Sequence, residues 1–267
     1  MIRSLRMWLS IGGALIAPST VLAYPGGTPS FQTDVAPFCA SCHSSRSIDY
    51  LVGAGPRAEK ETQEHKHIAV ILSGQRGYAK LSETDRKTLA EQIRALDEAS
   101  TIAIEAPASV NAGETFQVTV RVTGGSGPAV GVGLVDTAHR WYARPAASAG
   151  WTIAAPPQIF GTDGSAQTDW LDKRPEAAGR NLSFVNVTGI SSDSAMKKWA
   201  SAHVVFTLRA PTVAGSYPLA AAYWYGTEKA SLLGYTTNAM GRKEVRGGFG
   251  GGSGRVLFSE VLQIQVK

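Results

Sequence analysis

The sequence predicts three parts: a signal peptide at residues 1–23, a small all-α domain at residues 24–100, and an all-β antiparallel sandwich at residues 101–267. The apolar spacing separates the two domains. Before Ala99 apolar side chains recur at helical intervals, whereas after it they alternate with polar ones between Gly, Pro and Asn/Asp clusters. With 267 residues, 43% of them hydrophobic, the chain can form one large domain or two ordinary ones.

The N-terminus has the three regions of a secretory signal. Arg3 and Arg6 supply the positive start, residues 7–17 are mostly apolar, and residues 21–23 (Val-Leu-Ala) place small residues where signal peptidase cleaves. The apolar region is too short and too interrupted by glycine to span a membrane. We therefore expect a mature chain that begins at Tyr24, has no membrane span, and is periplasmic or secreted.

The predicted all-α domain ends in its clearest helix. Ser82 and Asp85 form a capping-box pattern that opens this helix. Its apolar face follows at i, i+4 and i+7 and consists of Leu89, Ile93 and Leu96.

The segment Cys39-Ala40-Ser41-Cys42-His43 carries the chemistry. C-x-x-C-H is the attachment signature for c-type haem: the two thiols can add to the two porphyrin vinyl groups, and the following histidine becomes the proximal iron ligand. A redox dithiol would require a βαβ context that the sequence lacks. A zinc site with His65 and His67 is disfavoured because these side chains point to different helix faces.

Residues 30–98, about a quarter of the chain, therefore resemble a class I c-type cytochrome domain with one covalent haem. The resemblance rests on Cys39, Cys42 and His43, on Gly55-Pro56 12 and 13 residues after the histidine, and on the helix after Ser82. It implies that the Pro56 carbonyl accepts the Nδ1 proton of His43 and so orients the proximal ring.

The sixth ligand departs from this family. Its usual methionine is missing, because residues 24–100 contain no methionine and Tyr78 stands four residues after Gly74, where the family often has it. Met196 and Met240 belong to the other predicted domain and are disfavoured. The internal candidates are His65, His67, Tyr78 and Lys80.

We favour His65 as the distal ligand. Residues 68–72 form a predicted short helix that ends at Gly74, and His65 lies nearer to the Ile68/Leu72 face than His67 does. The alternatives are His67, Tyr78 and a five-coordinate iron.

The predicted sandwich contains alternating strand-like runs, followed here in chain order: residues 101–110, 115–122, 130–135, 182–187, 202–208, 217–225 and 256–266. Gly113-Glu114 before the run Phe116–Val120 resembles the second strand of immunoglobulin-like and reeler-like secreted domains, which implies a fold and no activity. All five tryptophans of the mature chain lie here, as core or as a docking surface for electron transfer: Trp141, Trp151, Trp170, Trp199 and Trp224.

The composition excludes several functions. The net charge of +5 is not gathered into a Lys/Arg stripe, which argues against nucleic acid binding. No nucleophile triad, paired-carboxylate site or phosphate loop can be assembled, so an enzyme is less favoured than a carrier. The resemblance implies an exported monohaem cytochrome that transfers electrons between redox partner proteins, with the sandwich as a docking or anchoring module. The alternative is a haem protein with an open sixth position that binds a small ligand.

Overall fold

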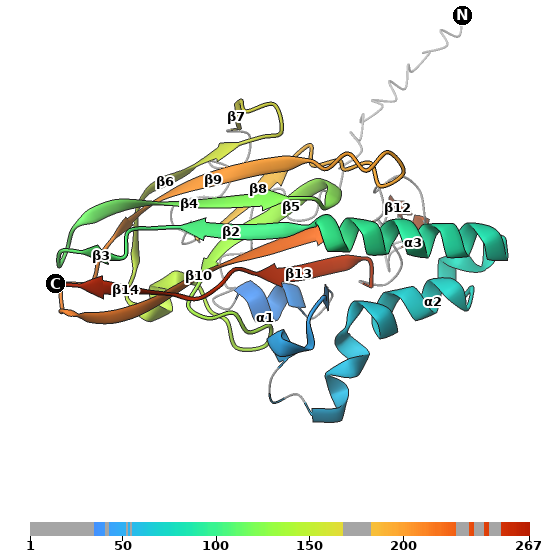
Figure 1. Ribbon diagram of the computed structural model, residues 1–267, viewed down its shortest axis with the longest axis horizontal. Helices are drawn as coiled ribbons and strands as arrows, with labels where there is room; N and C mark the ends of the chain where they lie inside the picture. Colours follow the sequence, from blue (N-terminus) through green and yellow to red (C-terminus); the bar gives the residue numbers. More distant parts are fainter. Residues whose placement is uncertain are drawn as a thin grey trace, which may run out of the picture.

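The structure, a computed structural model, describes residues 35–40, 43–51, 53, 55–167, 183–227, 235–237, 243–245 and 252–267. Strands account for 42% of the structure and helices for 27%. The strands of the described part form two large sheets and a short hairpin, and most of the helical segments lie at one end (Figure 1).

The smaller of the two large sheets has five strands, and all neighbours are antiparallel. In spatial order they are β2 (Thr101–Glu105), β4 (Thr115–Thr123), β9 (Ser201–Arg209), β6 (Thr152–Phe160) and β7 (Ala166–Gln167). The alternation at residues 115–122 coincides with β4, whose apolar side chains are buried and whose polar side chains lie on the other face.

The larger sheet has seven strands and is organised around β10 (Gly215–Gly226). Its path runs β1 (Ser44–Ser45), β13 (Gly254–Phe258), β10, β14 (Leu262–Val266) and β3 (Ser109–Val110), while β5 (Ser126–Val135) pairs with β10 and β8 (Phe184–Thr188) pairs with β5. The pairs β1–β13 and β14–β3 are parallel. A separate hairpin consists of β11 (Tyr235–Thr237) and β12 (Lys243–Val245).

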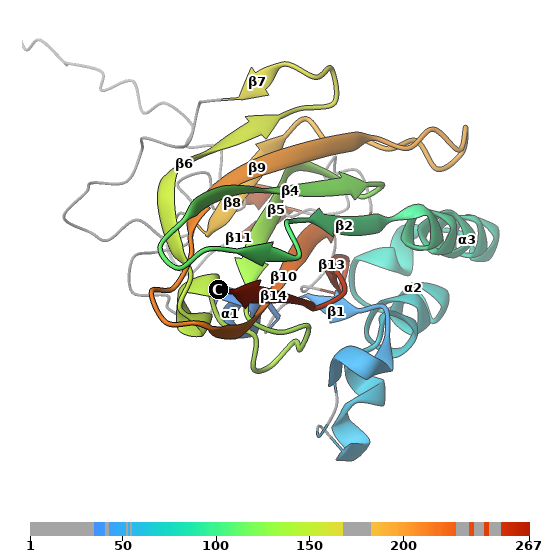
Figure 2. The same cartoon turned by 60° about the vertical axis from the view of Figure 1, so that its left-hand side comes forward.

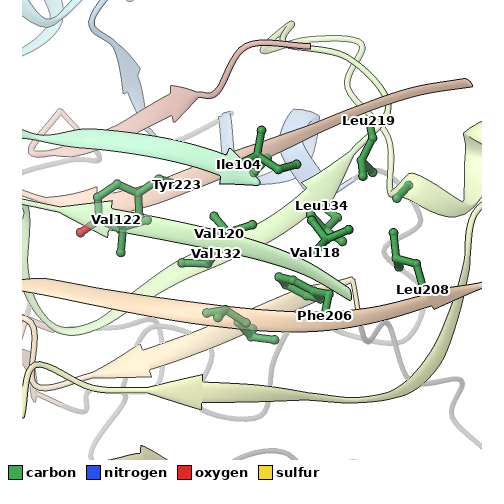
Figure 3. Packing of buried hydrophobic residues seen from close by; sticks show 14 of the residues in the cluster. Ile104, Val118, Val120, Val122, Val132, Leu134, Phe206, Leu208, Leu219 and Tyr223 are labelled. Atoms are coloured by element: carbon green, nitrogen blue, oxygen red, sulfur yellow. The ribbon is translucent and has the colours of Figure 1, made fainter. Parts of the chain in front are cut away.

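The main core lies between the two large sheets, which face each other (Figures 2 and 3). Val118, Val120 and Phe206 from the five-stranded sheet meet Val132 and Leu134 from the seven-stranded sheet, and none is more than 1% exposed. Burial of these branched and aromatic side chains is the dominant favourable contribution to folding here.

The helices are α1 (Val35–Ala40), α2 (Ala69–Leu72) and α3 (Glu83–Ala99), with short 3-10 or π turns between them. α2 and α3 pack side by side at one end of the sheets (Figures 1 and 2). The predicted cap of α3 is confirmed, because Ser82 Oγ accepts a hydrogen bond from the Asp85 backbone N–H at 3.1 Å. Ile93 and Leu96 on the predicted apolar face are buried.

The expectation of a small all-α cytochrome c domain followed by an all-β antiparallel sandwich is wrong. The described residues before Ser100 include β1, which extends the seven-stranded sheet beside β13. Ala36 and Cys39 also share a buried cluster with Val256 on β13. Helical spacing reports only local structure. It could not reveal that this segment pairs with β13, which lies more than 200 residues further along the chain.

Several features named in the sequence analysis lie outside the described residues: the signal peptide at residues 1–23, Cys42, Trp170 and Met240. Within the part of the chain that the structure describes, no helix is both long and apolar enough to cross a membrane.

Candidate functional site

The C-x-x-C-H segment begins at the end of α1. The backbone N–H of His43 donates to the Cys39 carbonyl at 3.1 Å, so the two residues are joined by one helical turn. Cys39 is 8% exposed and belongs to a buried cluster with Ala36, Trp224 and Val256. The cysteine predicted to bind haem therefore lies against the seven-stranded sheet.

The ring of His43 is held by β13. Its Nδ1 lies 2.9 Å from the carbonyl oxygen of Arg255, which can only accept, so Nδ1 carries the proton and the lone pair of the neutral ring is on Nε2. The ring also lies against Gly254, where an added Cβ would approach Nδ1 to 2.6 Å. Gly254 is thus required for close approach of the imidazole.

The charges around His43 favour its neutral form. Burial of the ring lowers its pKa to about 4; the bond to the Arg255 carbonyl opposes this shift, whereas the nearby cations of Arg140, Arg255 and Lys66 add to it. The imidazole is therefore unprotonated at neutral pH, which is the state a metal ligand requires.

Pro56 does not orient this histidine in the structure. It lies exposed in a 3-10 turn at Gly55–Arg57, and the acceptor for Nδ1 is the carbonyl of Arg255 instead. The resemblance implied the carbonyl of Pro56 as the acceptor, whereas in the structure the acceptor lies on a strand 212 residues from His43.

Arg140, a fully buried residue from the loop after β5, anchors the backbone of the motif. Its guanidinium donates to the carbonyl oxygens of Ala40 and His43 and to Glu61 Oε2, the last at 2.9 Å. Lys66 joins the same group through Glu61 Oε2 at 2.7 Å and the His43 carbonyl at 3.3 Å. Burial tends to raise the pKa of Glu61, but its bonds and proximity to Lys66 and Arg140 outweigh this and lower it.

Arg255 forms a second buried cationic centre on the other face of β13. Its Nε donates to both carboxylate oxygens of Asp97 on α3, at 3.1 and 2.9 Å, and its Nη1 donates to Ser44 Oγ at 2.7 Å. Tyr225 donates its hydroxyl to the same carboxylate at 2.9 Å. These bonds join α3, β10, β13 and the residue after His43 into one network.

The candidates for the distal ligand lie in different environments. His67 is 1% exposed; its Nδ1 accepts from Arg255 Nη2 at 3.1 Å, so Nε2 carries the proton and donates to the Tyr78 hydroxyl at 2.9 Å. Both ring nitrogens of His67 are thus engaged. Tyr78 is fully buried, whereas Lys80 is exposed.

His65 is exposed, and its Nδ1 lies 3.2 Å from Thr62 Oγ1. Because the Thr62 hydroxyl donates its proton to the Glu59 carbonyl, Nδ1 of His65 must be the donor. Its Nε2 therefore keeps a lone pair. Among the described residues, no group of three or more His, Cys, Asp or Glu side chains is placed to hold a metal ion.

Sequence reasoning missed Arg140, Arg255, Asp97 and Glu61. One of them left a signal: Asp97 lies four residues after Ile93 and so places an acid on the apolar face of α3, where a buried partner is required. Arg140 lies in a loop and Arg255 in a glycine-rich approach to a strand, and neither position distinguishes a buried arginine from an exposed one.

Comparisons with known proteins do not add a family to these observations. No protein-family model matches the chain, and no curated protein sequence matches it significantly.

Proposed function

We propose that the chain is an exported haem c protein that transfers electrons between redox partner proteins. The observation that carries this proposal is the hydrogen bond between Nδ1 of His43, the last residue of C-x-x-C-H, and the carbonyl oxygen of Arg255. The Arg255 carbonyl holds Nδ1–H and leaves the Nε2 lone pair for a metal, the arrangement expected of a histidine ligand.

The residues present fit a covalent haem. Cys39 and Cys42 would bond to the vinyl groups, and His43 Nε2 would ligate the iron. When bound, the haem would supply one-electron chemistry. The protein's own part is to fix the proximal ring through Arg255 and Gly254 and to hold the motif's backbone through Arg140. The haem would thus be held at the side of a β-sandwich and not in a separate all-α domain.

An open sixth position is the second candidate. His67 has both nitrogens engaged by Arg255 and Tyr78, and His65 is exposed. If neither residue binds the iron, a small molecule such as carbon monoxide or nitric oxide could reach it, and the protein would act as a sensor or an enzyme.

Covalent haem is tested on the chain produced with a haem-attachment system. Denatured protein should carry the mass of one haem, with both cysteines protected from alkylation. Two free thiols and no added mass would exclude the proposal. Cys39→Ala should lose the double attachment.

The visible spectrum separates the two candidate functions. A low-spin spectrum in both oxidation states, unchanged by carbon monoxide, favours electron transfer. A high-spin ferrous form that binds carbon monoxide readily favours an open site.

A further inference from the structure

The seven-stranded sheet is buried on both faces along the second half of β10 and along β13. Along β10, Tyr223 and Tyr225 point into the core between the sheets, whereas Ala222 and Trp224 belong to the second cluster, which includes Cys39. We call the side that carries Ala220, Ala222, Trp224, Val256 and Phe258 the outer face. The outer face packs against α1 and the first cysteine of the motif.

Two glycines on β5 leave room for the indole of Trp224 on the outer face. Its neighbours on β5 are Gly131, directly opposite Trp224, and Gly133. An added Cβ at Gly131 would lie 2.7 Å from the ring of Phe184 and 3.3 Å from the indole, and one at Gly133 would lie 3.1 Å from the indole. Neither glycine has a positive φ, so their role is to let the indole lie on the strand.

Trp224 has a polar atom without a hydrogen-bond partner among the described residues. The residue is 3% exposed, and its buried indole Nε1–H has no hydrogen-bond partner in the described structure. Buried indole N–H groups usually have a partner, because an unmade hydrogen bond is costly. Trp151 is the internal comparison: it is 1% exposed, and its Nε1 donates to the Pro218 carbonyl at 2.9 Å.

His43 lies on this same face. Val256 is directly opposite Trp224 in the sheet, and Gly254, two residues before Val256, shares its face. The Cβ direction of Gly254 leads into the His43 ring. Cys39, the His43 imidazole and the indole of Trp224 therefore all lie on the outer face.

We infer that the outer face of the seven-stranded sheet is a wall of the haem site and that Trp224 donates its indole N–H to a haem carboxylate. This inference rests on the proposed haem attachment. The two propionates are the carboxylate acceptors that a haem brings, and the buried indole is a donor on the face that carries Cys39 and the ring of His43. The β-sandwich would then complete the haem site directly.

The test uses the full haem-loaded chain with ¹⁵N in the tryptophan indoles. The Trp224 N–H signal, assigned through bonds and by its loss in Trp224→Phe, should differ strongly between the ferric and ferrous states, because a group near the iron senses its unpaired electron. The Trp151 signal, assigned with Trp151→Phe, should change much less. A Trp224 signal that is the same in both states would overturn the inference.

A second measurement tests the hydrogen bond itself. Trp224→Phe keeps an aromatic ring but removes the donor, so the pKa of the propionate should rise. The pH range in which the midpoint potential changes should therefore shift to higher pH. Trp151→Phe should leave that profile unchanged, and identical profiles for wild type and Trp224→Phe would contradict the assigned donor. The outcomes above would overturn only the role of Trp224. If wild-type protein carries no haem mass, the proposed function is rejected together with this inference.

Discussion

Arg255 and Asp97 form an ion pair that is closed to solvent: Nε of the arginine lies 3.1 and 2.9 Å from the two carboxylate oxygens, and the side chains are 0% and 2% exposed. The pair joins α3 to β13, and β13 also holds His43 through the Arg255 carbonyl. Hydrogen bonds of Arg255 therefore join α3, the seven-stranded sheet and His43, the predicted iron ligand.

Removal of Asp97 should strongly destabilise the protein. Asp97→Ala leaves the Arg255 cation buried without its carboxylate, which typically costs about 3–5 kcal/mol in the free energy of unfolding. Urea unfolding followed by circular dichroism measures this loss. Glu83→Gln is the control, since Glu83 pairs with Lys87 on the exposed side of the same helix and should change stability very little. Equal effects of the two substitutions would show that the buried pair has no special role.

The ion pairs of Glu61 should make stability depend on acid pH. Because Lys66 and Arg140 lower the folded-state pKa of Glu61 below its unfolded value, its contribution is complete above the unfolded pKa and is lost as pH falls through the folded pKa. Glu61→Gln should therefore be less stable than wild type at pH 7 by roughly 2 kcal/mol, as for a hydrogen bond to a charged group. Unfolding curves between pH 7 and pH 3 should converge at the acid end. A constant difference across this range would exclude the carboxylate charge as the cause.

Gly254→Ala should displace the ring of His43. The new Cβ would lie 2.6 Å from Nδ1 of His43, so the ring or the strand must move. In haem-loaded protein we expect an altered visible spectrum, because the orientation of an axial ligand affects the iron. Gly215→Ala is the matched control, since its Cβ would make only an ordinary 3.4 Å contact with Tyr217. An unchanged spectrum in Gly254→Ala would argue that His43 does not ligate the iron.

Substitution of His65 should mainly change the haem spectrum, whereas substitution of His67 should mainly change stability. His65→Ala removes an exposed imidazole whose Nε2 has a lone pair, so we expect a changed spin state of the haem and little change in stability. His67→Ala removes the partner of both Arg255 and Tyr78, so we expect a loss of about 2–3 kcal/mol in stability and a smaller spectral effect. Tyr78→Phe should change the spectrum little. If both histidine variants keep the wild-type spectrum, histidine ligation of the sixth position is excluded.

Features that depend on near neighbours in the chain could be predicted from the sequence. Ser82 and Asp85 are three residues apart, and their capping bond forms as expected. The alternation in β4 likewise places Val118 and Val120 in the core. Strand β6 was not predicted. It contains Pro156 and Pro157, which disfavour a strand, and its register shifts between Ile153 and Gln158.

The sequence by itself determined the composition and spacing of the motif: Cys39, Cys42 and His43 lie within five consecutive positions, and one helical turn joins Cys39 to His43. Only the tertiary structure decided what surrounds it. The carbonyl that orients His43 is 212 residues away, and Arg140, which holds the motif's backbone, is 97 residues from His43. The two-residue strand β1 pairs along its whole length with β13. Such contacts depend on which apolar faces the whole chain can bury together, and the spacing of residues within one segment does not predict them.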